Sequence, residues 1–459
     1  MRGLLYICQM LLPLSLLESL QSVAGFNRAA FEAVHASGEQ VTSIRLNPEK
    51  PMLDGPETSS GIPWCPHGYY LPSRPSFTLD PLFHAGAYYV QEASSMFIWK
   101  VLEQLLGDDT HKKVLDLCAA PGGKSSLLAS FFREGLVVAN EVIKQRAAVL
   151  VENLTKWGST QVVVTNNDPS HFQSLPGYFD VMVIDAPCSG SGMFRKDPAA
   201  IEEWSEDNVQ LCSQRQQRIL ADVLPALKED GLLLYSTCSY SKEEDEAIAD
   251  WLVSEMGMES RSFSVPAEWG IVETQAPEKG AHGYRFYPDR LKGEGFFIAV
   301  FQKKTAVAVS RLKELHLSLP SKQELQQVQS FIKLPEGYTL FKQGETIRTI
   351  PTRWWKDLQI LAKVLYIKKA GTGIGTIKGK DVIPEHELAL SGLWKGQFTP
   401  LSLTREQALQ YLRRKELLLP DSPAGWQLVA FEGLPLGWVK VLPNRVNNYY
   451  PAEWRILKE

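Results

Sequence analysis

The sequence predicts an α/β protein in which a doubly wound, largely parallel sheet lies between an N-terminal α/β extension and a small C-terminal β-domain. From about residue 86 to residue 304, short apolar runs alternate with helix-like segments, which is the pattern of βαβ units. After Lys304 the chain changes to short strands punctuated by Gly and Pro, which is typical of a small closed or half-closed β-domain. At 459 residues the chain is too long for one core, so two or three domains are expected.

The first 85 residues precede this regular pattern. A short apolar helix is expected at the start, helical spacing continues around residues 25–36, and a Pro/Gly-rich stretch covers residues 51–70. Gln9 and Pro13 interrupt the apolar start and no clear cleavage site follows, so we expect an amphipathic helix and not a signal peptide. No later segment is long and apolar enough to span a membrane, and no membrane partner is expected.

The cysteines are widely scattered and form no C-x-x-C pair. This spacing argues against a disulfide framework or a zinc site, so we expect no metal and a reducing, cytoplasmic compartment. The six residues are Cys8, Cys65, Cys118, Cys188, Cys212 and Cys238.

Five β-rich runs define the predicted parallel sheet, because apolar strands of four to seven residues separated by helices are typical of doubly wound folds. They are VLDL (114–117), LVVAN (136–140), QVVVT (161–165), VMVID (181–185) and GLLLYST (231–237). Residues 283–302 then read as two strands joined by a turn, which predicts an antiparallel edge.

The remainder of the chain is expected to form two further units. A polar helix is predicted over residues 310–330, a basic stretch follows over 331–383, and a second helix is predicted over 404–416. Short strands are predicted in WQLVAFEG and LGWVKVLP, between residue 426 and residue 443.

The loop in VLDLCAAPGGKSSLLAS (114–130) is a candidate binding site for a nucleoside cofactor. Gly122 and Gly123 permit a tight turn, and the helix that follows offers unpaired N–H groups. Neither G-x-G-x-x-G nor G-x-x-x-x-G-K-[ST] is present, so the loop suits a ligand without a pyrophosphate, such as S-adenosylmethionine.

Acidic residues follow the next three predicted strands, at the sheet edge where α/β proteins bind ligands. Glu141 is placed to accept hydrogen bonds from ribose hydroxyls, and Asp168 to accept one from the adenine amino group. Asp185 closes the fourth strand. A single acid at a strand end is more often a helix cap or a solvated residue, but three in successive strands favour a cofactor site.

Cys188 and Cys238 lie just beyond the fourth and fifth strands, in the polar contexts APCSG and STCSY. Two thiols and an acid match the needs of methyl transfer to carbon 5 of a pyrimidine, in which a thiolate adds to carbon 6 and a base later removes the proton from carbon 5. A thiolate needs nearby positive charge, for which Lys124 is the first candidate and Arg195 and Lys196 are more remote. The residues alone do not decide which cysteine attacks.

Three motifs, DLCAAPGGKS, DAPCSGSGMFRKDP and YSTCSYS, together resemble the Sun-type RNA cytosine-5 methyltransferase family. The resemblance extends to SIRLNPEK (43–50) and DPLFHAGAYYVQEASSMF (80–97) near the N-terminus. GWVKVLPNRVNNYYP (437–451) is similar to the C-terminal end of RsmF-type 16S ribosomal RNA methyltransferases.

The resemblance implies a role for each catalytic candidate. Cys238 would attack carbon 6, Cys188 would help to remove the carbon-5 proton, Asp185 would hydrogen-bond the cytosine edge, and Lys124 would support the site. Glu141 stands where many relatives carry Asp. The residues implied to hold S-adenosylmethionine are Cys118, Ala119, Ala120, Pro121, Gly122, Gly123, Lys124, Glu141, Arg146, Asp168 and Asp185.

The distribution of charge and aromatic residues suggests where RNA binds. Residues 305–459 carry 22 Lys and Arg against 14 Asp and Glu, whereas residues 1–304 carry 26 against 38. Basic residues between 342 and 380 alternate with Trp354, Trp355 and Tyr366, which suits phosphates and bases, although at least one tryptophan is expected to be core. The resemblance implies four units: an extension that receives RNA (1–85), a methyltransferase domain (86–304), a basic linking domain (305–385) and a PUA-like RNA-binding barrel (386–459).

The leading hypothesis is an S-adenosylmethionine-dependent RNA cytosine-5 methyltransferase acting as a monomer on small-subunit ribosomal RNA. The alternatives are the same chemistry on transfer RNA, or a non-catalytic RNA-binding or ribosome-assembly factor on the same scaffold. An amino-methylating enzyme is disfavoured because DAPCSG replaces an N/D-P-P-Y/F motif, and a dehydrogenase because the glycine fingerprint is missing.

Overall fold

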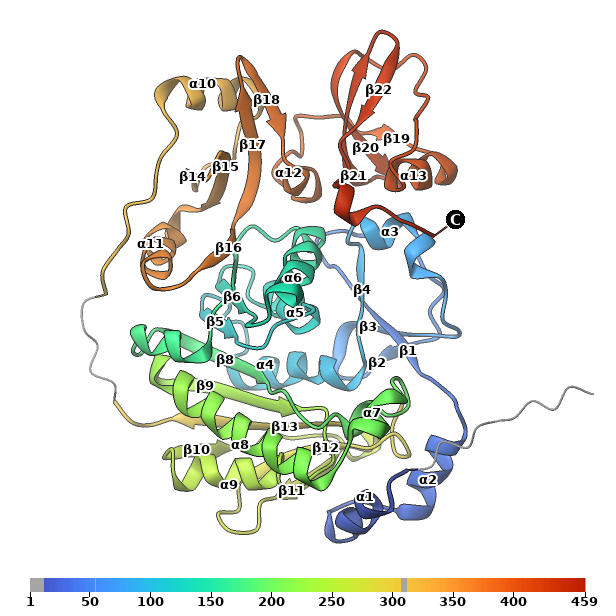
Figure 1. The fold of residues 1–459 in the computed structure, drawn as a ribbon, viewed down its shortest axis with the longest axis vertical. Helices are drawn as coiled ribbons and strands as arrows, with labels where there is room; N and C mark the ends of the chain where they lie inside the picture. The colour runs from blue at the N-terminus through green and yellow to red at the C-terminus, as the bar shows by residue number, and fades with distance from the viewer. Residues whose placement is uncertain (1–11, 54, 307–311, 459) are drawn as a thin grey trace, which may run out of the picture.

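A large mixed sheet forms the centre of the computed structural model, which describes residues 12–53, 55–306 and 312–458 (Figure 1). The five predicted strands are confirmed, and they pair in parallel in the order β9-β8-β5-β6-β7. Their bounds are β5 Lys113–Asp116, β6 Leu136–Asn140, β7 Val162–Thr165, β8 Phe179–Asp185 and β9 Leu227–Thr237.

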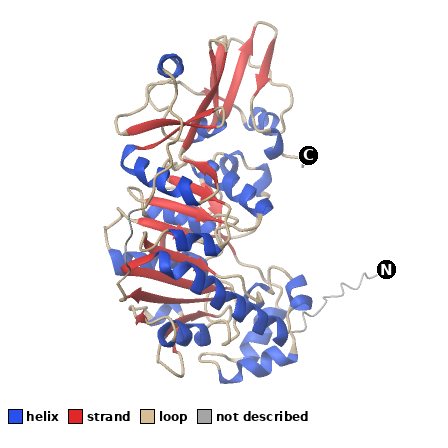
Figure 2. Ribbon diagram, turned by 60° about the vertical axis from the view of Figure 1, so that its left-hand side comes forward, coloured by secondary structure: helices blue, strands red, loops and turns tan. Residues whose placement is uncertain are grey.

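Helices cover both faces of this sheet (Figure 2), as a doubly wound fold requires. Because side chains alternate across a strand, Val181 and Val183 of β8 face one helical layer, while Met182 and Ile184 face the other. The first layer contains α4 (Ile98–Leu106), α5 (Gly123–Phe131) and α6 (Lys144–Trp157); the second contains α8 (Glu206–Val223), α9 (Glu246–Ser254) and α11 (Trp355–Val364).

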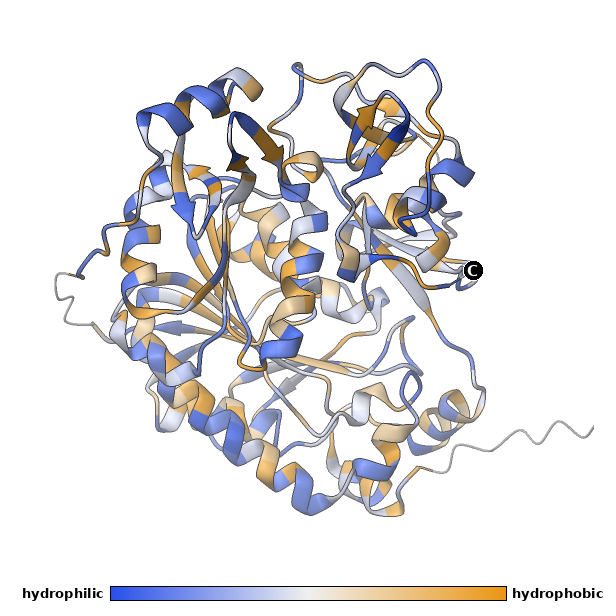
Figure 3. Ribbon diagram, turned by 45° about the horizontal axis from the view of Figure 1, so that its top comes forward, coloured by the Kyte–Doolittle hydropathy of each residue, from blue (hydrophilic) through white to orange (hydrophobic). Residues whose placement is uncertain are grey.

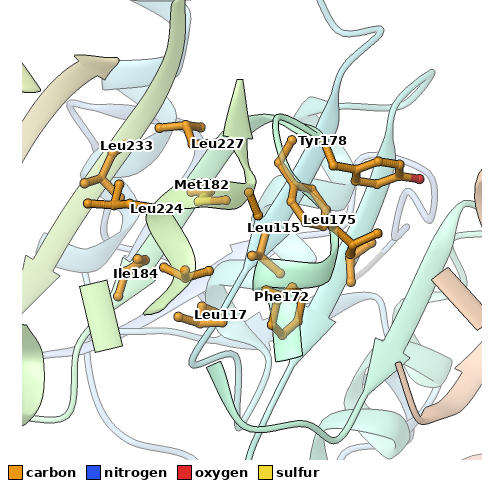
Figure 4. Close-up of a cluster of buried hydrophobic side chains, with 14 of the residues drawn as sticks. Leu115, Leu117, Phe172, Leu175, Tyr178, Met182, Ile184, Leu224, Leu227 and Leu233 are labelled. Carbon is orange, nitrogen blue, oxygen red and sulfur yellow. The ribbon is translucent and has the colours of Figure 1, made fainter. Parts of the chain in front are cut away.

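The second layer is a dense apolar cluster (Figure 4). Leu115, Met182, Ile184 and Leu233 project from three neighbouring strands towards residues that include Phe172, which follows β7. The helices bury one face and expose the other, so orange and blue stretches alternate along them in Figure 3.

Antiparallel strands extend the sheet beyond β9. β12 (His282–Phe286) and β13 (Phe296–Lys303) confirm the predicted strand pair, and β13 pairs antiparallel with β9. β11 (Val272–Gln275) pairs with β12, and β10 (Met258–Arg261) with β13.

The linking region contributes β16 (Ile367–Ala370) to the other end of the same sheet, antiparallel to β7, which the sequence did not predict. The helix expected over 310–330 begins only at Lys322, as α10 (Lys322–Phe331), because Ser321 and Glu324 form a capping box there. The rest of this region forms a second sheet of β14 (Tyr338–Gln343), β15 (Thr346–Pro351), β17 (Thr372–Lys378) and β18 (Asp381–Pro384), followed by α12 (His386–Leu390).

The N-terminal extension contains helices and a sheet of its own. α1 (Leu14–Ser19) and α2 (Arg28–Ala36) confirm helices in the expected places, whereas Cys8 and the start of the predicted first helix lie outside the described residues. The sheet, in the order β2-β3-β1-β4, was not predicted; its strands are β1 (Thr42–Leu46), β2 (Ser60–Ile62), β3 (Cys65–Leu71) and β4 (Tyr88–Val90).

The C-terminal unit is a four-stranded sheet with one helix, α13 (Arg405–Leu412). The sheet contains β19 (Leu401–Ser402), β20 (Gly425–Phe431), β21 (Leu434–Leu442) and β22 (Arg445–Asn448). Tyr411 and Val439 of this unit share one apolar cluster with Ile44 and Tyr88 of the N-terminal sheet, whose last strand lies beyond the expected end of the extension at residue 85. Through the described part of the chain, no helix has the length and apolar character needed to cross a lipid bilayer.

Candidate active site

The two cysteines singled out by the sequence lie side by side. β8 and β9 are neighbouring parallel strands, with Asp185 in register with Ser236, so the loops after them leave the sheet at the same edge. The Sγ atoms of Cys188 and Cys238 are 3.1 Å apart, and both side chains are half-buried.

This proximity changes the acidity of Cys188. The hydrogen bond that the Cys188 thiol makes with Cys238, together with burial, raises the pKa of Cys188 well above that of a free thiol.

A cation and an acid lie beside the thiols. The Nζ atom of Lys124, near the start of α5, is 2.8 Å from Oδ2 of Asp185, at the end of β8. Burial opposes the charged form of Lys124, but attraction to Asp185, and less strongly to Asp116 and Cys238, outweighs burial and raises its pKa. Ser236 donates a hydrogen bond of 2.9 Å to the other oxygen of Asp185.

The two more remote cations take other partners. Arg195 is buried, donates a hydrogen bond of 2.6 Å to the carbonyl oxygen of Glu39, and lies 3.7 Å from the Glu294 carboxylate. The Lys196 ammonium, like Arg195, attracts the Glu294 carboxylate. Of the three candidate cations, Lys124 is the one whose charge is attracted by Cys238.

The loop between β5 and α5 has the groups needed for a nucleoside with an amino-acid tail. Gly122 adopts φ +113°, which disfavours residues with a Cβ, and lets the chain turn into α5. Burial, then Asp116, Asp185 and Glu141, raise the pKa of Cys118, so three carboxylates surround this thiol. Oδ1 of Asp116 is buried and has no hydrogen-bond partner in the described part of the molecule. Carboxylate acceptors of this kind fit the ribose hydroxyls and amino group of S-adenosylmethionine.

Glu141 and Arg146 connect this loop to α6. Glu141 accepts a hydrogen bond of 2.9 Å from the Ile143 N–H, and its other oxygen lies 3.4 Å from Nη1 of Arg146. Nη2 of Arg146 donates 2.8 Å to the carbonyl oxygen of Ala120. Arg146 therefore connects the carboxylate of Glu141, directly after β6, to the cofactor loop.

Asp168 has the local role that single acids at strand ends usually have. Its carboxylate accepts hydrogen bonds from the N–H and the hydroxyl of Ser170, at 3.0 and 2.7 Å, and these lower its pKa. Asp168 is exposed at the same edge of the sheet, but these bonds tie it to its own turn. A contact with adenine remains a prediction.

The acidic stretch after Cys238 has a structural role that the sequence analysis missed. Glu244 is fully buried and hydrogen-bonds to Ser189 and Ser239, the residues that follow the two cysteines. The run SKEEDE (241–246) looks like a solvated charged turn in the sequence. Its position shortly after the T-C motif is the feature of the sequence that could have indicated this role.

The aromatic residues expected to stack on RNA divide into core and surface. Trp354 is 5% exposed and Trp355 packs against the same apolar cluster, whereas the Tyr366 side chain is 63% exposed with the Lys368 ammonium 5.6 Å from its ring centroid. Five of the nine basic residues between 342 and 380 form ion pairs: Lys342, Arg348, Arg353, Lys356 and Lys369. The other four have no carboxylate partner in the ranges that the structure covers.

Curated relatives match this chain over most of its length. A protein from Aliivibrio salmonicida named Ribosomal RNA small subunit methyltransferase F is 29% identical over 409 residues, which cover 85% of each chain. A protein of the same name from Vibrio parahaemolyticus is 27% identical and covers 96% of this chain and 97% of the relative. Among solved structures, a methyltransferase homolog protein from Pyrococcus horikoshii is 28% identical with a TM-score of 0.51, covering 64% of this chain and 100% of that one.

Protein-family models match three consecutive parts of the chain. The N-terminal domain of 16S rRNA methyltransferase RsmF matches residues 12–93, 16S rRNA methyltransferase RsmB/F matches 103–302, and the methyltransferase RsmF PUA domain matches 398–456. The three matched ranges contain, in order, the N-terminal sheet (β1 to β4), the parallel strands of the large sheet (β5 to β9) and the C-terminal sheet (β19 to β22). The chain therefore belongs to the RsmF-type 16S rRNA methyltransferase family, whose cofactor is S-adenosylmethionine.

Proposed function

We propose that this protein methylates carbon 5 of a cytosine in small-subunit ribosomal RNA through a covalent bond between Cys238 and the base. The observation that carries the proposal is the pair of thiols 3.1 Å apart, next to the Lys124–Asp185 ion pair. These groups supply a nucleophile, a second group for proton removal, a cation and an acid, which together meet the needs of the reaction.

Attack begins at the Cys238 thiolate, which Lys124 stabilises. Its Sγ bonds to carbon 6 of the cytosine, and the electron pair of the double bond between carbons 5 and 6 moves so that carbon 5 becomes nucleophilic. Asp185 accepts a hydrogen bond from the exocyclic amine at the cytosine edge, which orients the ring for attack. The base must be unpaired or flipped out for this geometry, at a cost of a few kcal/mol.

The cofactor loop would hold the methyl donor near this site. S-adenosylmethionine, when bound, supplies an electrophilic methyl group for carbon 5. Glu141 and Asp116 would accept hydrogen bonds from its hydroxyl and amino groups, while residues 118–124 would cradle it with their backbone. Arg146 would hold the loop in place through Ala120.

Release depends on Cys188. Once Cys238 is bonded to carbon 6 it no longer carries a negative charge, so the interaction that raises the pKa of Cys188 is removed. Cys188 then ionises more readily at the stage at which a base is required. It accepts the proton from carbon 5, the electrons of that bond restore the ring double bond, and Cys238 leaves as a thiolate.

The relatives' names support ribosomal over transfer RNA as the substrate. We assign RNA contacts to the N-terminal extension (1–85), catalysis to residues 86–304, a linking role to 305–385 and RNA binding to the PUA-like unit (386–459). With a ribosomal substrate, we expect the enzyme to act in the cytoplasm, as a monomer and without a metal.

The test uses the Cys188→Ala protein with cofactor and total RNA. We expect a covalent protein–RNA adduct that is lost in the Cys188→Ala, Cys238→Ser double variant, and sequencing of the trapped RNA identifies the substrate. If the adduct contains transfer RNA alone, the substrate is transfer RNA and not ribosomal RNA. Absence of methylation by the wild-type protein on RNA and on assembled subunits would favour the non-catalytic alternative.

A further inference from the structure

One buried carboxylate joins the loops that carry the two cysteines. Oε1 of Glu244 accepts a hydrogen bond of 2.8 Å from the main-chain N–H of Ser189. Oε2 accepts hydrogen bonds of 2.6 Å from the hydroxyls of both Ser189 and Ser239. Because these serines directly follow Cys188 and Cys238, a single side chain fixes the backbone next to both thiols.

Glu244 is itself held in place. Gln216 donates 3.2 Å to Oε1 and also 3.1 Å to the carbonyl oxygen of Pro187, immediately before Cys188. The Tyr235 hydroxyl donates 2.6 Å to the main-chain oxygen of Glu244. The carboxylate is 0% exposed, so its position does not depend on a solvated loop.

The two loops depend on Glu244 to different degrees. On the Cys238 side, the Ser239 N–H has a different partner and donates 3.2 Å to the Thr237 hydroxyl. The Gly192 N–H, from the Cys188 loop, donates 2.9 Å to the Cys238 carbonyl oxygen and joins the two loops to each other. On the Cys188 side, Glu244 takes both the N–H and the hydroxyl of Ser189. Loss of Glu244 therefore frees Cys188 more than it frees Cys238.

We propose that Glu244 is a positioning residue that holds the Cys188 thiol against Cys238, so that release of the covalently bound RNA depends on it. The inference rests on the proposed function, because it assigns attack to Cys238 and proton removal to Cys188. Glu244 makes no hydrogen bond with either thiol, so its effect passes through Ser189 and Ser239.

The first experiment compares Glu244→Ala with Cys188→Ala and with the wild-type protein. For Glu244→Ala we expect kcat to fall by about 100-fold, as a displacement near 1 Å at a reacting group produces. The covalent RNA adduct should accumulate and KM for RNA should fall together with kcat, because the slowed step follows attack, while Kd for S-adenosylmethionine stays within about twofold. Glu243→Ala is the matched control, because the neighbouring Glu243 side chain has no hydrogen bond or ion pair in the described structure.

Two milder variants keep the inference testable if Glu244→Ala fails to fold. Glu244→Gln keeps one oxygen for the Ser189 N–H and Gln216, and its amide faces two hydroxyls that can turn to accept. We therefore expect it to retain kcat within about tenfold. Ser189→Ala removes one hydroxyl bond, and we expect a smaller but measurable accumulation of adduct.

A measurement without RNA probes the geometry itself. Diamide takes two electrons and two protons from a pair of thiols and leaves a disulfide, so its reaction reports how well Cys188 and Cys238 face each other. We expect this disulfide to form more slowly in Glu244→Ala than in Glu243→Ala.

The outcomes separate the inference from the proposed function. An adduct with Cys188→Ala but none with folded Glu244→Ala, or an unchanged kcat in that variant, would overturn the role of Glu244 alone. A loss of activity that is explained by weaker cofactor binding alone would also overturn the role of Glu244. No adduct with Cys188→Ala would overturn the division of labour between the cysteines and the inference with it.

Discussion

At the residue scale, Lys124 has a charge role that can be read from a pH profile. Its ammonium lies beside Asp185 and attracts the Cys238 thiolate. In Lys124→Met this attraction is lost, so we expect kcat/KM to fall by about 100-fold and its acidic limb to move to higher pH. The measurement is kcat/KM for RNA between pH 6 and pH 10, roughly the range in which thiols titrate.

A matched control separates this effect from a general loss of charge. Lys144, on the exposed first turn of α6, makes no ion pair in the described structure. We expect Lys144→Met to keep the wild-type profile. A pH profile unchanged in Lys124→Met would contradict the role of the ammonium in thiolate formation.

Asp116 provides a second prediction at this scale, on stability. Burial raises its pKa from 3.8 to about 7. Between these values the folded chain holds a proton that the unfolded chain has lost, so the free energy of unfolding falls as pH rises through this window. Asp116→Asn has no carboxyl group to titrate, so its free energy of unfolding does not fall in this way. We expect the free energy of unfolding of the variant minus that of the wild type to increase by about 2–4 kcal/mol from pH 5 to pH 8.

Chemical denaturation at the two pH values measures this difference. Asp108→Asn is the control, because the Asp108 carboxylate is exposed in the turn after α4 and folding does not remove it from water. An equal change with pH in both variants would show that Asp116 is not the titrating group.

The sequence revealed the residues that follow strand ends and missed those that act through long-range contacts. Cys188, Cys238 and Asp185 were identified because parallel strands deliver their ends to one edge. Glu244 was not, because its partner Ser189 is 55 positions away and an acidic run normally indicates a solvated turn. Burial, which decides between these readings, has no local signature in the sequence.

At the element scale, the same limit explains why β16 was unexpected. Its sequence, IKKA, is short and contains two lysines, so it does not look like part of a buried sheet. Lys369 is buried there because its ammonium lies 2.6 Å from Glu387, which also pairs with Arg348 at 2.7 Å. The five central strands were predictable because each is an apolar run, which is the pattern of a strand buried on both faces.

Tyr366 immediately precedes β16 and is the aromatic residue of this region that we expect to stack on RNA. Its carbonyl oxygen accepts from the Asn166 N–H, which places it just beyond the carboxyl end of β7, at the catalytic edge. We expect Tyr366→Ala to weaken RNA binding about tenfold or more, because base stacking is worth about 1–3 kcal/mol.

Tyr366→Phe is the matched control, since it keeps the aromatic face and should bind RNA as the wild type does. Affinities measured by titration at one fixed salt concentration make the comparison, because phosphate contacts depend strongly on salt. Equal affinities for Tyr366→Ala and Tyr366→Phe would exclude stacking at this position.

At the scale of the whole molecule, the ends of the chain meet and support the cofactor loop. The C-terminal unit covers Ile44 and Tyr88 of the N-terminal sheet, and Figure 1 shows it against α3 (Pro81–His84). Strand β1 of that sheet also carries Arg45, which donates 3.2 Å to the carbonyl oxygen of Gly123 and 2.6 Å to the Ser126 hydroxyl. The C-terminal unit is thus connected to α5 through a single strand.

Removal of residues 398–459 therefore affects more than RNA binding. The deletion exposes the apolar side of the N-terminal sheet, so we expect Tm to fall by at least about 5 °C. Loosening β1 also loosens Arg45 and the start of α5, so Kd for S-adenosylmethionine should rise. Differential scanning calorimetry and cofactor titration measure the two effects, with Tyr366→Ala as a variant that weakens RNA binding and leaves both unchanged. A truncated protein with the wild-type Tm and cofactor affinity would mean that the C-terminal unit is an independent RNA tether, because its packing against β1 would then contribute nothing to the site.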